Sequence, residues 1–182
     1  MWPWLAWQLN SSPHGAATCP GPFYSLNEAR VEDWPTGLQK YITDMKRGEN
    51  EAKVPYDLVY VCSLVADAFF VMIRGGMACN PRSHLRLIYE GNPMALVVEE
   101  AGGLGSTGVG PILDVQPTKV CRQLHPWMTA VGSRLLLPVA GGAQVHERLP
   151  VFLGSELDIR ELESYGVKYG GVQQLGTKTY QQ

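Results

Sequence analysis

Cysteine is scarce in this sequence and is never closely paired. The four cysteines among 182 residues are Cys19, Cys62, Cys79 and Cys121. A zinc site or a thioredoxin-like motif needs a C-x-x-C pair, so metal binding through thiolates is not expected. Disulfide frameworks belong mostly to smaller secreted domains. We therefore interpret the four cysteines as isolated thiols.

Charge is also limited, and this excludes one class of partner. Charged residues make up 18% of the chain, and the formal net charge is −2. General binding to a phosphate backbone needs clustered Lys and Arg, so no nucleic-acid partner is expected. Hydrophobic residues make up 45%. This composition predicts one globular domain with a hydrophobic core and argues against a disordered chain.

Two segments have almost no charge. Residues 1–27 contain no Asp, Glu, Lys or Arg, and residues 121–144 contain two Arg and no acid. Residues 1–21 also lack a helical or strand period, so we predict no regular structure there.

The sequence lacks clear targeting and membrane signals. No basic segment precedes the apolar N-terminus, and no Arg marks a transit peptide. The most hydrophobic stretch, residues 58–73, contains Asp67 and is shorter than the roughly 20 residues that span a bilayer. We expect no membrane segment and, by default, an intracellular protein.

Helical and strand patterns alternate along the rest of the chain. Apolar spacing and capping residues predict helices that begin near Pro35, Ser63, Asn92 and Ser155 and end before Gly48, Gly75, Gly102 and Gly166. Expected strands cover residues 56–61, 84–89, 111–115 and 151–153. One helix face is expected to be buried through Leu38, Tyr41, Ile42 and Met45, and candidate core positions of the last helix are Leu157, Leu162 and Tyr165. Helical spacing is also followed by Leu64, Phe69, Met72 and Ile73, and one strand face is shared by Leu85, Leu87 and Tyr89. The polar tail, 167–182, is expected to fray. The alternation predicts a layered α/β architecture.

Common nucleotide and catalytic motifs are missing or misplaced. Residues 103–108 match G-x-G-x-x-G, but a helix is expected before them and a loop after them. A dinucleotide site needs a strand before the glycines and a helix after them, so chance explains this match. The sequence contains no H-E-x-x-H, G-x-S-x-G or P-loop lysine motif.

Glu90 is the one acidic residue whose position suggests chemistry. It follows the apolar strand expected at 84–89 and precedes a helix. Ligands of open α/β sheets bind at this edge, and a carboxylate there can hold a hard cation such as Mg²⁺. The alternative, which the residues alone favour, is a carboxylate that serves only the adjacent helix N-terminus.

Three longer stretches resemble one enzyme family. They are Tyr24-Ser25-Leu26-Asn27-Glu28, Leu85-Arg86-Leu87-Ile88-Tyr89-Glu90-Gly91-Asn92-Pro93-Met94-Ala95 and Leu113-Asp114-Val115-Gln116-Pro117-Thr118. In order and spacing they resemble the carboxyl-terminal half of class 1 fructose-1,6-bisphosphatases. The resemblance covers 22–120 and 146 to about 165, and it implies a layered α/β/α phosphatase domain (22–166) with a mixed sheet.

The resemblance implies an activity and a set of site residues. Enzymes of this family use Mg²⁺ to promote attack of water on the 1-phosphate of fructose 1,6-bisphosphate. By the resemblance, Glu90 is a metal ligand, and Asn27 and Tyr60 donate hydrogen bonds to the 6-phosphate of the sugar bisphosphate. Arg30 replaces a phosphate-binding tyrosine and can still pair with phosphate. His84 replaces a lysine beside the same phosphate, and it is largely neutral at pH 7.

Two further positions depart from the family pattern, and half of the family sequence is absent. Val59 stands where the family has an arginine, and Asn80 where it has a tyrosine. The missing amino-terminal half carries most metal carboxylates, so we expect no appreciable bisphosphatase activity from this chain alone. Residues 121–145 interrupt the pattern and are predicted to be an insertion. We expect 1–21 and 121–145 to be translated non-coding sequence or segments not selected to fold.

Two other functions stay open. The chain can be a non-catalytic binding or assembly module that associates with complete bisphosphatase subunits as a homo- or hetero-oligomer, because apolar surface meant for the missing half would be exposed. An unrelated structural α/β domain is the remaining alternative. Either fructose or sedoheptulose bisphosphate fits the resemblance as substrate. The expected compartment is cytoplasmic, with the plastid stroma as the alternative.

Overall fold

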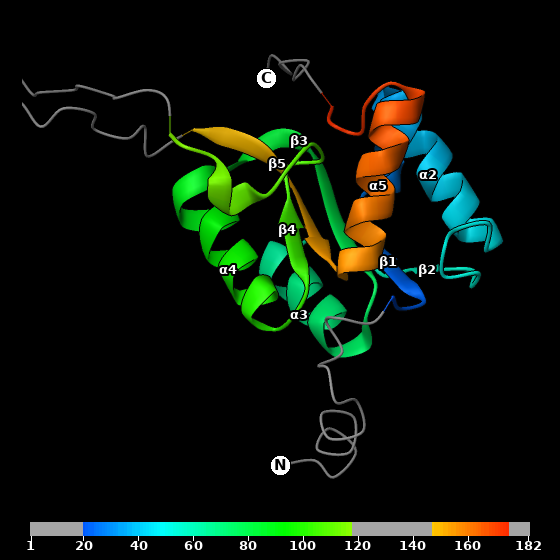
Figure 1. The fold of residues 1–182 in the computed structure, drawn as a ribbon, viewed down its shortest axis with the longest axis horizontal. Helices are drawn as coiled ribbons and strands as arrows, with labels where there is room; N and C mark the ends of the chain where they lie inside the picture. The colour runs from blue at the N-terminus through cyan, green and yellow to red at the C-terminus, as the bar shows by residue number, and fades with distance from the viewer. Residues whose placement is uncertain (1–19, 118–146, 175–182) are drawn as a thin grey trace, which may run out of the picture.

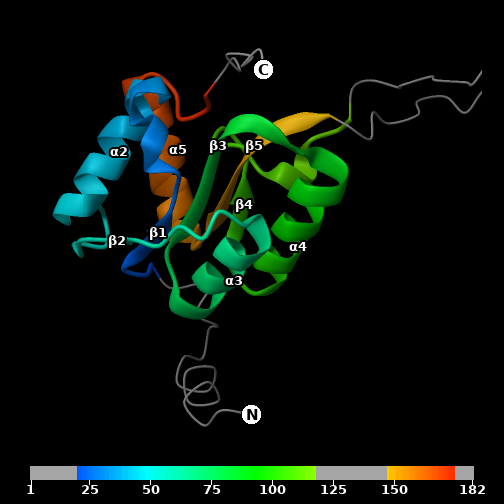
Figure 2. The same cartoon turned by 180° about the vertical axis from the view of Figure 1, so that it is seen from behind.

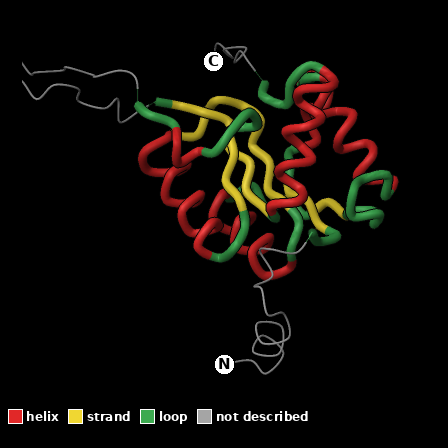
Figure 3. Tube along the Cα trace, in the orientation of Figure 1, coloured by secondary structure: helices red, strands yellow, loops and turns green. Residues whose placement is uncertain are grey.

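Five strands form one mixed sheet in the computed structural model, which describes residues 20–117 and 147–174. They are β1 (Phe23–Ser25), β2 (Asp57–Leu58), β3 (Met77–Arg86), β4 (Leu104–Ser106) and β5 (Arg148–Gly154), in the order β2-β1-β3-β5-β4. β1 runs parallel to both β2 and β3, whereas β5 runs antiparallel to β3 and β4. Figure 3 shows these strands between helices on either side.

Helices cover both faces of the sheet. α2 (Thr36–Arg47) and α5 (Glu156–Tyr169) pack together on one face, and α3 (Leu64–Arg74) and α4 (Asn92–Glu100) cover the other (Figures 1 and 2). Successive side chains of a strand point to opposite faces. In β5, Phe152 therefore packs in the core cluster with α2 and α5, while Val151 and Leu153 pack in the cluster with α3 and α4. The predicted α/β/α layering with a mixed sheet is confirmed.

Local sequence signals place several helix ends correctly. α2 ends at Gly48, whose φ of 69° is the left-handed conformation that glycine adopts without strain. α3 begins after Ser63, whose hydroxyl accepts a 3.5 Å hydrogen bond from the Ala66 N–H. α5 begins after Ser155, whose hydroxyl accepts a 3.2 Å bond from the Asp158 N–H. The core residues expected in α2 are all buried: Leu38, Tyr41, Ile42 and Met45.

The strand expected at 84–89 is wrong at both ends. β3 begins earlier, at Met77, and ends at Arg86, while Leu87–Gly91 forms a π-helical turn that continues into α4. Leu85 and Leu87 are buried, whereas Tyr89, which was expected on the same strand face, is 48% exposed. Asn92 does not cap α4, because Gly91 before it is already helical and no side-chain cap bond forms.

The other strand predictions are partly wrong. β2 is shorter than the strand expected at 56–61, and residues Ile112–Asp114 form a 3-10 turn where a strand was expected at 111–115. β4 lies within the glycine-rich 103–108 segment, where no strand was predicted. α4 precedes these glycines, so the arrangement of a dinucleotide fingerprint is absent from this segment.

The carboxyl-terminal helix extends beyond its predicted end. α5 continues past Gly166 to Tyr169, and Val172 after it is buried. Residues 167–169, which were expected to belong to a frayed tail, are therefore helical. Leu157, a candidate core residue, is exposed, and so is Phe69 of α3, whose helical spacing was predicted. Both side chains face away from the sheet, on the outer sides of their helices.

Some predictions fall outside the described residues. They concern the predicted insertion at 121–145, all but the last two residues of 1–21, and the tail from residue 175. No helix within 20–117 and 147–174 is long and apolar enough to cross a membrane.

Candidate functional site

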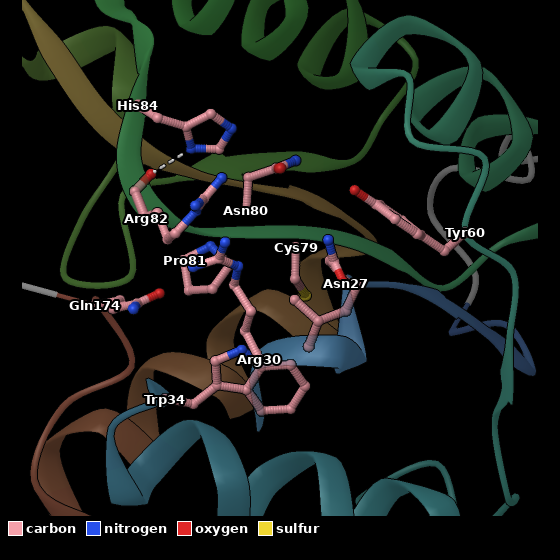
Figure 4. Close-up of a pocket in the computed structure, with 11 residues that line it drawn as sticks. Asn27, Arg30, Trp34, Tyr60, Cys79, Asn80, Pro81, Arg82, His84 and Gln174 are labelled. Atoms are coloured by element: carbon pink, nitrogen blue, oxygen red, sulfur yellow. Dashed lines mark hydrogen bonds between the residues drawn. The ribbon is translucent and has the colours of Figure 1, made fainter. Parts of the chain in front are cut away.

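A pocket lies beyond the carboxyl ends of the three parallel strands. Asn27 lies two residues beyond β1, Tyr60 lies two residues beyond β2, and Asn80 lies two residues beyond the last position at which β3 pairs with β1. Parallel strands bring their carboxyl ends to one edge of a sheet, where ligands of α/β proteins commonly bind. Eleven residues line the pocket, and Figure 4 shows them: Leu26, Asn27, Arg30, Trp34, Tyr60, Cys79, Asn80, Pro81, Arg82, His84 and Gln174.

A bulge in β3 supplies one wall of the pocket. Asn80 pairs with Val151, and the next pair joins Leu85 to Leu149, so residues 81–84 lie opposite the single residue Pro150. Proline has no backbone N–H to donate to a ladder, which explains the break in pairing at this point. The extra residues leave the plane of the sheet and bring Arg82 and His84 to the pocket.

Asn27 and Tyr60 present hydrogen-bond donors. The Asn27 side-chain oxygen accepts a 3.2 Å bond from the Ala29 N–H, which leaves its amide NH₂ group to donate. The Tyr60 hydroxyl donates to the Cys62 sulfur at 3.3 Å. This bond, with partial burial, raises the pKa of Tyr60, so the hydroxyl stays protonated at neutral pH. Sulfur is a weak acceptor, and a ligand oxygen can therefore take its place.

Two arginines give the pocket its positive character. Arg30 and Arg82 direct their side chains into the pocket, and Asn27 and Tyr60 lie on its other side (Figure 4). None of the eleven lining residues is Asp or Glu. Guanidinium groups with neighbouring amide and hydroxyl donors suit an anion with several oxygens, such as phosphate.

His84 is a neutral member of this group. Burial lowers the pKa of His84 below its ordinary value of 6.5, and this effect outweighs the hydrogen bond to the Arg82 carbonyl oxygen. The ring Nδ1 lies 3.0 Å from that carbonyl oxygen. A carbonyl only accepts, so Nδ1 carries the proton, and in the neutral ring Nε2 is an acceptor. His84 therefore contributes no permanent charge to the pocket.

Glu90 lies outside the pocket, and its carboxylate contacts Arg86, the residue just before its own turn. Its Oε2 accepts a 2.8 Å bond from the Arg86 N–H and lies 3.9 Å from the Arg86 guanidinium. The π-helical turn Leu87–Gly91 carries it, instead of the end of a strand. The expectation that Glu90 directly follows an apolar strand is wrong, and its contact with the turn agrees with the alternative of a carboxylate serving a helix N-terminus.

The described residues do not fit a magnesium ion. Within 20–117 and 147–174, no three His, Cys, Asp or Glu side chains are grouped closely enough to hold a metal ion. Mg²⁺ prefers six oxygen ligands in near-ideal octahedral geometry, and Glu90 supplies at most one carboxylate, with an arginine beside it. Further ligands would have to come from elsewhere.

The four predicted substrate-binding residues lie together in the pocket: Asn27, Arg30, Tyr60 and His84. Arg82, Asn80 and Gln174 line the pocket as well, although no motif or family match pointed to Arg82 or Gln174. The loop ahead of His84 is shorter in this chain than in the family pattern, so Arg82 has no matched counterpart there. Cys79 also lines the pocket, but burial raises the pKa of its thiol well above the ordinary value, which leaves it unreactive. The arrangement suits an anion and contains no activated nucleophile among its lining residues.

Comparisons with known proteins agree with the motifs. The sequence model of the family described as "Fructose-1-6-bisphosphatase, C-terminal domain" matches residues 19–137. The chain is 34% identical over 151 residues to "Fructose-1,6-bisphosphatase, chloroplastic" of Brassica napus, and equally identical to the protein of that name from Spinacia oleracea. Each match covers 80% of this chain and 30% of the relative. The chain thus spans less than a third of the length of these relatives, and it belongs to the fructose-1,6-bisphosphatase family through the C-terminal domain.

Proposed function

We propose that this chain is the substrate-side domain of a fructose-1,6-bisphosphatase and binds the 6-phosphate of the sugar bisphosphate in its pocket. One observation carries this proposal: a single pocket without an acidic lining residue holds Asn27, Arg30, Tyr60 and His84. In the full reaction, water attacks the phosphorus of the 1-phosphate, and the sugar oxygen leaves with a proton. The pocket would hold the other end of the sugar during that step.

Hydrolysis requires groups beyond the described residues. Metal ions in phosphatases polarise the phosphoryl group and activate water, and a pair of such ions needs several carboxylates. Glu90 is the family's metal-binding position in this domain, and it is already engaged by Arg86. We therefore propose that the chain alone binds sugar phosphate but hydrolyses fructose 1,6-bisphosphate at no appreciable rate, even with Mg²⁺.

Binding and turnover measured on the same preparation test both parts of the proposal. Isothermal titration calorimetry should detect fructose 6-phosphate but not fructose, and a phosphate-release assay with Mg²⁺ should stay at background. A chain that does not bind fructose 6-phosphate would contradict the binding role. Phosphate release at the rate of a full-length enzyme would contradict the inactivity.

A second candidate function is assembly with bisphosphatase subunits. We define the α3 face as Val61, Val65 and Phe69, which are 58%, 64% and 59% exposed. A helix that is apolar on its outer side usually packs against another chain or domain. The chain spans 30% of the relatives' length, so the remainder of such a protein is a partner of suitable kind. Co-purification of the chain with a full-length chloroplastic fructose-1,6-bisphosphatase tests this function.

The names of the relatives support a proposal about the compartment. Both named relatives are chloroplastic. We propose the plastid stroma in preference to the cytoplasm, and imaging a fluorescent fusion of the protein in leaf cells tests it. Signal confined to the cytosol would contradict this assignment.

A further inference from the structure

A phosphate-binding pocket needs a permanently charged side chain. His84, which stands at the family's lysine position, does not provide one. A phosphate monoester carries a charge of about −1.5 to −2 at pH 7, so its binding site requires strong positive charge. His84, which replaces a lysine of the family, is neutral and uses its Nδ1 proton on the Arg82 carbonyl. The charge in this wall of the pocket therefore has to come from another side chain.

Arg82 is held in place to supply that charge. It sits in the bulge of residues 81–84, and its backbone is fixed from both sides. The Pro81 carbonyl accepts a 2.8 Å bond from the Gln174 N–H, and Arg82 and Gln174 form an isolated parallel bridge. The Arg82 carbonyl accepts the His84 bond. With the backbone held in this way, the side chain extends into the pocket near His84 and Asn80 (Figure 4).

The contacts of Arg82 leave its guanidinium available. Within the described part of the chain, the Arg82 side chain makes no ion pair, whereas Arg86 and Arg160 pair with Glu90 and Glu156. A guanidinium presents five donors in a fixed fork that matches the oxygens of phosphate, which an ammonium or a neutral imidazole cannot do. Arg30 reaches the same pocket from the turn after β1.

We propose that Arg82 is the specificity-determining residue of this pocket and that, together with Arg30, it selects the phosphate monoester group of a sugar phosphate. This inference rests on the proposed function, because it assigns the cation for the same phosphate. It also accounts for phosphate binding although His84 stands at the family's lysine position. The permanent positive charge lies two residues earlier in the sequence, on Arg82 in the bulge.

Calorimetric titrations of the full chain with two probes, fructose 6-phosphate and inorganic phosphate, test the proposal. Arg82→Gln should weaken binding of both probes by about 10- to 100-fold, the loss expected for a hydrogen bond to a charged group. Arg82→Lys keeps the charge but loses the fork, so its binding should fall between those of the wild type and Arg82→Gln. Arg160→Gln removes an exposed arginine of α5 and should bind as the wild type does.

The outcomes separate this inference from the proposed function. Equal binding of fructose 6-phosphate by the wild type and Arg82→Gln would overturn the role of Arg82 and leave the sugar-phosphate function standing. Arg82-dependent binding of inorganic phosphate without binding of fructose 6-phosphate would support the anion site and overturn the sugar role. Binding of neither probe by the wild type would overturn both. Thermal unfolding of each variant identifies any loss of binding that is caused by misfolding.

Discussion

The Tyr56 hydroxyl donates a 2.7 Å hydrogen bond to the carboxylate of Asp158, which joins the loop before β2 to the first turn of α5. Both side chains are buried, and Asp158 is 0% exposed. The second carboxylate oxygen accepts a 2.6 Å bond from the Ser155 hydroxyl. Burial raises the pKa of Asp158 although both hydrogen bonds act in the opposite direction. The two hydroxyls therefore offset part of the cost of burying this acid.

Removal of the Tyr56 hydroxyl tests how much this contact stabilises the fold. Tyr56→Phe should lower the free energy of unfolding by about 1–3 kcal/mol, because one oxygen of a buried carboxylate loses its donor. Urea unfolding followed by circular dichroism measures the change. The control is Tyr169→Phe on α5, at a tyrosine that is 43% exposed, and it should change stability by less than about 0.5 kcal/mol. Equal effects of the two variants would mean that the Asp158 contact contributes nothing specific.

Asp44 should make the stability of the domain sensitive to acid. Its burial favours the neutral form, but bonds from Lys40 at 2.7 Å and from the Tyr165 hydroxyl at 2.9 Å outweigh this effect and lower the pKa of Asp44. A carboxyl with a lowered pKa in the folded state binds fewer protons there than in the unfolded state near that pKa. Its stabilisation is present above the unfolded pKa and is lost as the pH falls through the folded pKa.

Asp44→Asn therefore changes the pH dependence as well as the stability. The variant should be less stable than the wild type at pH 7, and the difference should shrink between about pH 5 and pH 3. Urea midpoints measured across this range test the prediction. Glu156→Gln, at an exposed ion pair, is the matched control and should show almost no such convergence. A difference between wild type and Asp44→Asn that stays constant with pH would contradict the assigned pKa shift.

The two donors opposite the arginines should contribute to affinity for sugar phosphate. Tyr60→Phe removes a hydroxyl that donates to a weak sulfur acceptor, and it should weaken binding of fructose 6-phosphate by about 3- to 10-fold. Asn27→Ala should have a larger effect, because it also removes the cap on the Ala29 N–H. Calorimetry at one pH and salt concentration makes the comparison. Unchanged affinity in Tyr60→Phe would exclude the hydroxyl as a phosphate donor.

The α3 face offers a separate test of assembly. Replacing Phe69 by Glu puts a charge at a position that is 59% exposed, so the fold should tolerate it. Co-purification with a full-length bisphosphatase should nevertheless be lost, because the charge would be buried in the complex. Val167→Glu is the control, since Val167 is 89% exposed on α5. Retained co-purification of the Phe69 variant would show that this face is not the contact.

Helix ends were predictable from sequence because their determinants are local. Gly48 and Ser155 act through the conformation and hydrogen bonds of their own turn. The strands were harder to predict, since β1 has three residues and β2 has two, too few to show a period. The 84–89 segment has a strand pattern, yet its second half forms a helical turn that leads directly into α4. Tertiary packing decided between the two patterns there.

The site was predictable only through the family resemblance. Asn27 and Tyr60 are far apart in sequence and form no general catalytic motif. The parallel register of β1 and β2 brings them together. Arg82 had no sequence signal at all. Its orientation depends on a bulge opposite Pro150, which lies on a strand that follows much later in the chain. Local reasoning cannot detect a feature that arises from the pairing of two distant segments.

The position of β5 has a consequence for the order of folding. Among the strands of residues 20–117 and 147–174, β5 comes last in sequence, yet it pairs with β3 on one side and with β4 on the other. During synthesis, β3 and β4 emerge first with open hydrogen-bonding edges, which favour aggregation until β5 arrives. The family match ends at residue 137, before β5 begins at Arg148. A polypeptide that stopped there would carry most of the pocket's residues but would lack the strand that closes the sheet beneath them.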